Sequence, residues 1–145
     1  MEKLTGWRIL SAVEEVRPGK SARTKAKNWT SGYAPEFLML EMMAQTGGLV
    51  VGAVRNFTGN VVFAKVENAE FTCDTAEDLS IEAFAHDGVS EQGSWIDAQV
   101  LSGPKKIAAA RFFLIDAGDL NGTGKSLTFH NEFLDYYRVR QKILL

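Results

Sequence analysis

The longest apolar run of the chain, residues 35–54, limits the folds that this sequence can adopt. Pro35 suits the first turn of a helix, because its missing backbone N–H would be unpaired there in any case. Leu, Met, Ala, Glu and Gln dominate the first half of the run, and these residues favour helix. No face of the resulting helix would be fully polar. We therefore expect a long helix that is buried on most sides.

A membrane span is the alternative interpretation of the same run. The run is near the lower length limit for crossing a bilayer, and it lacks flanking aromatic belts. Glu41, Gln45 and a pair of glycines also interrupt it. We therefore predict a core helix and no membrane span.

Glu41 is a carboxylate within an apolar helix, and burying an unpaired charge is costly. Gln45 lies one turn further along the same face, followed by Gly48 and Gly52. One interpretation is a structural carboxylate that pairs with a backbone N–H, a lysine or water. The other is a general acid or base whose pKa is raised by burial. Glycines on this face favour close approach of a strand, a partner chain or a ligand.

Residues 35–45 read Pro-Glu-Phe-Leu-Met-Leu-Glu-Met-Met-Ala-Gln. This segment resembles the central-helix motif Pro-Gly-x-Leu-x-x-Glu-x-x-Ala-Gln of the 3-hydroxyacyl-acyl carrier protein dehydratases, and a similar pattern continues to about residue 115. The resemblance implies an α+β hotdog fold, in which a curved antiparallel sheet wraps a long central helix, and it implies a dimer. It also implies that Glu41 acts as the catalytic acid or base.

The dehydratase family has a catalytic His in a His-Phe-Pro-Gly segment just before the helix. Residues 28–35 of this chain read Asn-Trp-Thr-Ser-Gly-Tyr-Ala-Pro and contain no His, so Asn28 is the nearest substitute for that base. The two histidines, His86 and His130, lie elsewhere in the chain. We expect substrate binding by the loop before the helix, by the helix start and by the motif glutamine: Trp29, Gly32, Tyr33, Pro35 and Gln45.

The remaining residues show mainly strand patterns. Residues 7–16 and 21–28 predict a hairpin, and four more strands follow the helix at 61–71, 79–85, 94–101 and 106–115. Strands that follow a helix in this way predict an α+β fold with an antiparallel sheet. We divide the chain into a single domain at 1–116 and a C-terminal loop with a helical tail at 117–145. The tail helix is expected over residues 131–144.

The second strand of the hairpin alternates strictly. Arg23, Lys25 and Lys27 would share one face, and Ala22, Thr24 and Ala26 the other. The basic face is either a solvated strand face or a binding surface for an acidic acyl carrier protein or the phosphates of coenzyme A.

Composition excludes some function classes. A net charge of −2 gives no electrostatic case for nucleic-acid binding. The single cysteine, Cys73, cannot form an internal disulfide and has no metal-binding motif around it, and the N-terminal segment lacks the apolar core of a signal peptide. We expect a cytoplasmic protein that uses no metal and no cofactor.

Three functions remain open. The favoured one is a 3-hydroxyacyl-thioester dehydratase of fatty acid or polyketide-type metabolism, with Glu41 and a non-standard partner such as Asn28 or Tyr33. The second is a catalytically silent subunit that binds an acyl group or its carrier, since the family His is missing. The third is a thioesterase in which Glu41 activates water or attacks the thioester. The expected partners are acyl carrier protein or coenzyme A thioesters, and a second copy or a related hotdog subunit.

Overall fold

The computed structural model describes residues 7–27, 32–72, 78–118 and 129–145. Two strands, β1 (Ala12–Arg17) and β2 (Ser21–Lys27), precede the long helix α1 (Pro35–Gly52), which continues as the 3₁₀ turn η1 (Ala53–Arg55). The next four elements are the strands β3 (Val61–Phe71), β4 (Asp78–Ala85), β5 (Ser94–Ser102) and β6 (Lys105–Asp116). The chain ends with a short helix, α2 (Asn131–Tyr136), and a 3₁₀ turn, η2 (Val139–Lys142).

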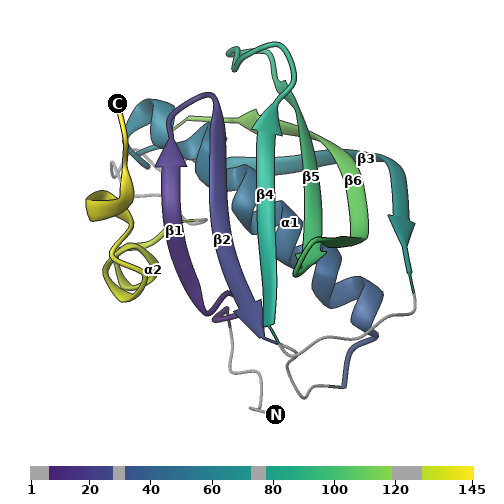
Figure 1. The fold of residues 1–145 in the computed structure, drawn as a ribbon. Coiled ribbons are helices and arrows are strands. Elements are labelled where there is room, and N and C mark those ends of the chain that lie inside the picture. The colour runs from purple at the N-terminus through teal and green to yellow at the C-terminus, as the bar shows by residue number, and fades with distance from the viewer. Residues whose placement is uncertain (1–6, 28–31, 73–77, 119–128) are drawn as a thin grey trace.

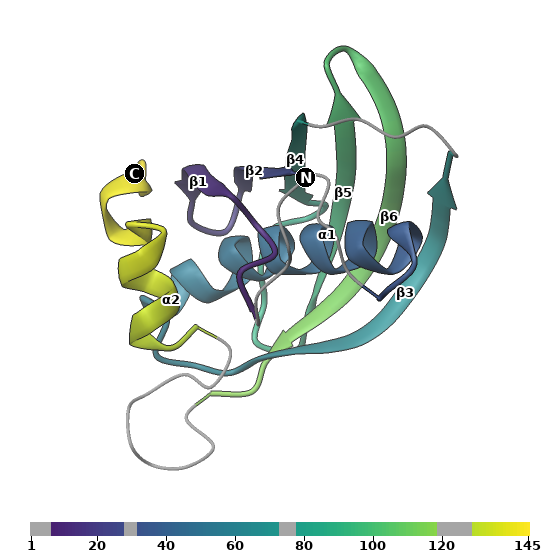
Figure 2. The same ribbon diagram turned by 90° about the horizontal axis from the view of Figure 1, so that it is seen from below.

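The six strands form one antiparallel sheet in the order β1-β2-β4-β5-β6-β3. The sheet curves around α1, which lies in its concave side (Figures 1 and 2). The α+β architecture with an antiparallel sheet is therefore confirmed, and five of the six predicted strands are present within one residue of their expected bounds. The first strand, expected over residues 7–16, begins only at Ala12. The predicted hairpin turn is also present, with Gly19 at a φ of +72° after Pro18.

Helix α1 is a core helix. By length and composition the segment Pro35–Arg55 could span a membrane, yet 67% of its apolar 18-residue window is buried inside the protein, as is typical of a core helix. The helix backbone approaches the sheet closely at Gly47, where a Cβ would lie 3.0 Å from Cγ2 of Ile96. Small buried residues on the facing strands, Ala98, Ala108 and Ala110, allow this approach.

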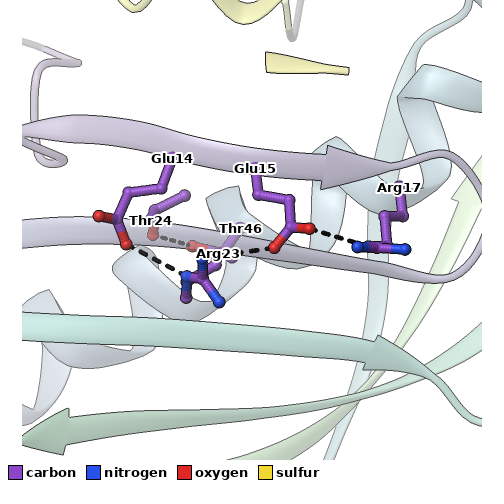
Figure 3. Close-up of polar contacts among 6 residues, drawn as sticks. All are labelled: Glu14, Glu15, Arg17, Arg23, Thr24 and Thr46. Carbon is purple, nitrogen blue, oxygen red and sulfur yellow. Dashed lines mark hydrogen bonds and ion pairs between the residues drawn. The ribbon is translucent and has the colours of Figure 1, made fainter. Parts of the chain in front are cut away.

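A buried pair of hydroxyl groups joins α1 to β2. The Oγ1 atoms of Thr24 and Thr46 lie 2.8 Å apart, and neither residue is exposed (Figure 3). The Thr46 hydroxyl donates to the carbonyl oxygen of Met42 at 2.7 Å, so the Thr24 hydroxyl is the donor to Thr46. This arrangement follows from the predicted alternation of β2, which buries Ala22, Thr24 and Ala26.

The C-terminal tail differs from the prediction of one helix over 131–144. Helix α2 ends at Tyr136, and Arg138 takes a left-handed conformation with a φ of 52° before η2 begins. The turn coincides with tertiary contacts: the Tyr137 hydroxyl donates to the carbonyl oxygen of Leu10 at 2.7 Å, and Val139 is fully buried. Burial against the domain outweighs the helical propensity of the segment.

The two edges of the sheet have different surroundings. At the β1 edge, Ile143 forms a parallel bridge with Val16, and the Leu144 N–H donates to the Val16 carbonyl. At the opposite edge, β3 pairs only with β6 among the described strands. Most of its residues are exposed, including Val62 and Phe63.

Candidate functional site

A pocket of about 310 Å³ lies between α1, β3, β6 and the C-terminal tail. Helix α1 contributes one face, the two strands contribute apolar side chains, and the N- and C-terminal segments contribute aromatic rings. The lining residues are Trp7, Leu40, Glu41, Ala44, Gln45, Gly48, Val61, Phe63, Leu114, Phe129 and Phe133. Among the lining residues that α1 contributes, only Glu41 and Gln45 have polar side chains. The pocket therefore presents a carboxylate and an amide to an otherwise apolar space.

Glu41 is exposed at this pocket rather than enclosed by it. Partial burial of its carboxyl nevertheless raises its pKa above the ordinary value of 4.5, because desolvation disfavours the charged form. Exposure to solvent limits the size of this effect. No hydrogen bond or ion pair to Glu41 occurs among the described residues, so the structural interpretation of a paired carboxylate gains no support.

Gln45 has one satisfied and one unsatisfied polar atom. Its Nε2 donates to the carbonyl oxygen of Trp7 at 3.3 Å. Its Oε1 is buried and has no hydrogen-bond partner within the described part of the chain. Because a buried acceptor without a donor is destabilising, this oxygen is a natural place for a donor group of a ligand.

The two glycines on this face of α1 accommodate Phe129 of the tail. A Cβ at Gly48 would lie 2.9 Å from Cζ of Phe129, and a Cβ at Gly52 would lie 3.1 Å from its Cδ2 and Cε2. The close approach expected at these glycines is thus made by the aromatic ring of another segment of the same chain.

Neither histidine lines the pocket. His130 caps α2, with its Nδ1 accepting a hydrogen bond from the Phe133 N–H at 3.2 Å. Its ring makes an edge-to-face contact with the ring of Trp7, with centroids 5.0 Å apart. His86 lies beyond the end of β4, where its Nδ1 is 3.4 Å from Oδ2 of Asp97. Asp97 is also bound by Nε of Arg111 at 2.8 Å. The structure therefore brings neither His86 nor His130 next to Glu41.

The start of α1 is open to solvent. Gly32, Tyr33 and Pro35 are exposed, and none of them lines the pocket in a single chain. The rings of Tyr33 and Phe37 stack with centroids 5.2 Å apart, and both remain exposed. No side chain of the described residues caps the helix, and the Leu38 N–H donates to the carbonyl oxygen of Ala34 at 3.2 Å. The Glu36 and Phe37 N–H groups have no hydrogen-bond partner among the described residues, so they can meet a ligand oxygen. Asn28 and Trp29 lie outside the described residues.

The basic face of β2 is partly neutralised. Nε of Arg23 lies 3.2 Å from Glu14, and its Nη2 lies 3.4 Å from Glu15, which also pairs with Arg17 (Figure 3). Lys25 is exposed, and Lys27 at the end of the strand is half-buried. The predicted alternation is confirmed, but the face carries less net positive charge than the sequence of β2 alone indicates, because β1 supplies carboxylates beside it.

Metal-binding groups do not gather anywhere in residues 7–27, 32–72, 78–118 and 129–145. No three His, Cys, Asp or Glu side chains in these ranges could hold an ion together. Cys73 lies outside them.

A scan against models of protein families finds no match to this chain, and neither does a search of curated proteins. Solved structures do match it. A dehydratase heterocomplex, ApeI:P from Xenorhabdus doucetiae, superposes with a TM-score of 0.64 at 13% identity, over 77% of this chain and 84% of that chain. A hypothetical thioesterase from Streptococcus pneumoniae gives a TM-score of 0.61 at 15% identity, over 81% and 98%.

This chain has the hotdog fold. A further hotdog structure, an uncharacterized protein from Pyrococcus horikoshii, has a TM-score of 0.59 and 15% identity, and covers 77% of this chain and 86% of that chain. At such identities the similarity establishes the hotdog fold and not the activity. The expectation of a hotdog fold with a long central helix is thereby confirmed.

Three aromatic residues of the pocket, Trp7, Phe129 and Phe133, were not expected there from the sequence. None of the three lies in α1 or in a strand of the sheet, and Trp7, which was expected in the first strand, precedes the start of β1 at Ala12. The pair Gly48 and Gly52 could have indicated Phe129, because two glycines one turn apart leave room for a flat ring.

Proposed function

We propose that this hotdog protein dehydrates a 3-hydroxyacyl thioester, with Glu41 as the acid and base. The observation that carries the proposal is the position of Glu41, with a raised pKa, beside an apolar pocket of acyl dimensions. A carboxyl whose pKa is raised by partial burial can both accept and return a proton. The similarity of residues 35–45 to the dehydratase motif supports the same assignment.

In the proposed reaction the Cα–H and Cβ–O bonds of the substrate break and a Cα=Cβ double bond forms. The Glu41 carboxylate takes the α-proton, and the resulting acid returns a proton to the β-hydroxyl, which leaves as water. This cycle needs no histidine. The free N–H groups at the start of α1 stabilise the charge that develops on the thioester oxygen. Asn28, in the segment where the dehydratases have their His, orients the substrate.

Gln45 binds the substrate in this proposal. Its buried Oε1 has no donor within the described chain, and a 3-hydroxyl group is a donor of the right kind. Pro35, Gly32 and Tyr33 form the entrance through which the thioester reaches the pocket, and Trp29, which lies outside the described residues, is assigned to substrate binding with them. A phosphopantetheine carrier or coenzyme A in the cytoplasm would present its phosphates to Lys25 and Lys27, with Arg23 held by its carboxylate partners.

A second hotdog subunit completes the entrance. The outer edge of β3 has no strand partner in the described chain, and Val62 and Phe63 are exposed along it. An unpaired apolar edge strand pairs readily with another strand. We propose a dimer through this edge, formed with a second copy or with a related hotdog chain.

A catalytically silent binding subunit is the second candidate. The observation that favours it is the absence, among the described pocket residues, of any ionisable side chain other than Glu41. The hotdog match within a dehydratase heterocomplex is consistent with pairing of unlike subunits. The third candidate, a thioesterase, uses Glu41 on water and would release a thiol.

One assay separates the three functions. The purified protein is mixed with a 3-hydroxyacyl pantetheine thioester, and both unsaturated thioester and free thiol are followed. Unsaturated product supports the dehydratase, and free thiol supports the thioesterase. Binding of the thioester with neither product supports the silent subunit and contradicts the dehydratase.

A further inference from the structure

We infer that Phe129 sets the maximum length of the acyl group, by closing the far end of the pocket that begins at Glu41. The inference rests on the proposed function in one respect, that the acyl group occupies this pocket. It assigns a specificity-determining role to a residue of the C-terminal tail, outside the segment that resembles the dehydratases.

The pocket follows one face of α1. Glu41, Gln45 and Gly48 lie on successive turns of that face, and all three line the pocket. The seven residue-to-residue steps from Glu41 to Gly48 correspond to about 10 Å of helix. A group that enters beside the carboxylate and runs along this face reaches the ring of Phe129 at Gly48.

The ring of Phe129 is firmly held at this point. It is 3% exposed, and it fits against the Cβ-free surface of Gly48 and Gly52. Edge contacts with Phe57 and Phe133, at centroid distances of 5.5 and 5.3 Å, fix it from the other sides. A ring packed between a helix backbone and two further rings is poorly placed to swing away for a longer ligand.

The size of the pocket gives the length limit. At roughly 30 Å³ for each water-sized group, a volume of about 310 Å³ holds on the order of ten non-hydrogen atoms. This predicts short to medium acyl groups. Removal of the Phe129 ring would open the space along α1 towards Gly52 and admit longer ones.

The test measures binding without turnover. S-alkyl pantetheine thioethers, from butyl to hexadecyl, are titrated calorimetrically into the wild-type protein and into Phe129→Ala and Phe129→Leu. We expect the wild-type affinity to rise about fourfold with each methylene, as burial of a methylene dictates, and then to stop rising near the predicted length. In Phe129→Ala the rise should continue over several more methylenes, and in Phe129→Leu over fewer.

Tyr137→Phe is the matched control. It removes a buried hydrogen bond from the same tail, but Tyr137 does not line the pocket. An unchanged length limit in Phe129→Ala and Phe129→Leu would overturn the inference, and so would an equal shift in Tyr137→Phe, since loosening of the tail alone would then explain it. A failure of the thioethers to bind would also overturn it. Absence of turnover of 3-hydroxyacyl thioesters, with the Phe129-dependent limit present, would refute only the dehydratase function.

Discussion

The ring of Phe129 occupies the space that a side chain at Gly48 would need. A Cβ at Gly48 would lie 2.9 Å from Cζ of the ring, closer than folded proteins tolerate without a shift. This contact joins the C-terminal tail to the central helix and forms one wall of the proposed acyl pocket. Its consequences can be measured separately from any activity.

Gly48→Ala should destabilise the protein by about 1–3 kcal/mol, the usual cost of overpacking a core. In a Phe129→Ala background the same substitution should instead be neutral or stabilising by up to about 1 kcal/mol, because alanine is the better helix former once the ring is gone. Urea unfolding of the four proteins in this double-mutant cycle measures the coupling. Additive effects would show that the two residues do not meet.

The hydroxyl pair Thr24 and Thr46 should respond unequally to replacement by valine. Thr46→Val leaves the buried Thr24 hydroxyl without an acceptor, which should cost about 1–3 kcal/mol. Thr24→Val leaves Thr46 still donating to Met42, so the loss should be smaller, about 0.5–1.5 kcal/mol. Denaturant unfolding measures both values. The reverse order would contradict the assigned direction of the hydrogen bonds.

Much of this fold could be predicted because the periodicity of apolar residues along the sequence reflects which side chains are buried in each strand and helix. The alternation of β2 predicted a strand with one buried face, and the apolar run of α1 predicted a buried helix; both are present in the structure. The tail could not be predicted in the same way, since the interruption at Arg138 coincides with contacts that Tyr137 and Val139 make with distant residues. Such contacts leave no periodic trace in the sequence.

The candidate site was predictable in part for the same reason. Glu41 and Gln45 were identified as a carboxylate and an amide on an apolar helix, and the pocket does bring these two together. The basic face of β2 was predicted, but its pairing with the carboxylates of Glu14 and Glu15 was not, because these come from a neighbouring strand. The assignments of catalysis and substrate binding remain predictions.

The raised pKa of Glu41 predicts a pH dependence of stability. Its folded pKa exceeds the unfolded value of 4.5, so the folded protein holds the extra proton and loses stability as pH rises through the folded pKa. Glu41→Gln should therefore gain stability relative to wild type from about pH 4 to pH 7. Thermal unfolding across this range measures the difference. Glu91→Gln, at an exposed turn residue, is the reference substitution. A Glu41→Gln protein that is less stable than wild type over this pH range would contradict the desolvation of Glu41.

The proposed dimer predicts a response at the β3 edge. Val62→Lys places a charge on an exposed apolar position of the unpaired strand and should shift the protein towards the monomer, because a desolvated lysine opposes strand pairing. Sedimentation velocity measures the oligomeric state. Leu144→Lys makes a similar change at the opposite edge of the sheet and should leave that state unaltered. A wild-type protein that sediments as a monomer would contradict a homodimer.

The central claim is that Glu41 carries the proton transfers of dehydration. The most direct measurement is the rate at which a 3-hydroxyacyl pantetheine thioester gains the ultraviolet absorbance of its unsaturated product, in wild type, Glu41→Gln and Glu91→Gln. We predict that Glu41→Gln lowers kcat by at least about 100-fold, the usual contribution of a general acid or base, while Glu91→Gln retains the wild-type rate. Product formed by Glu41→Gln at the wild-type rate, or no product from the wild-type protein, would contradict the claim.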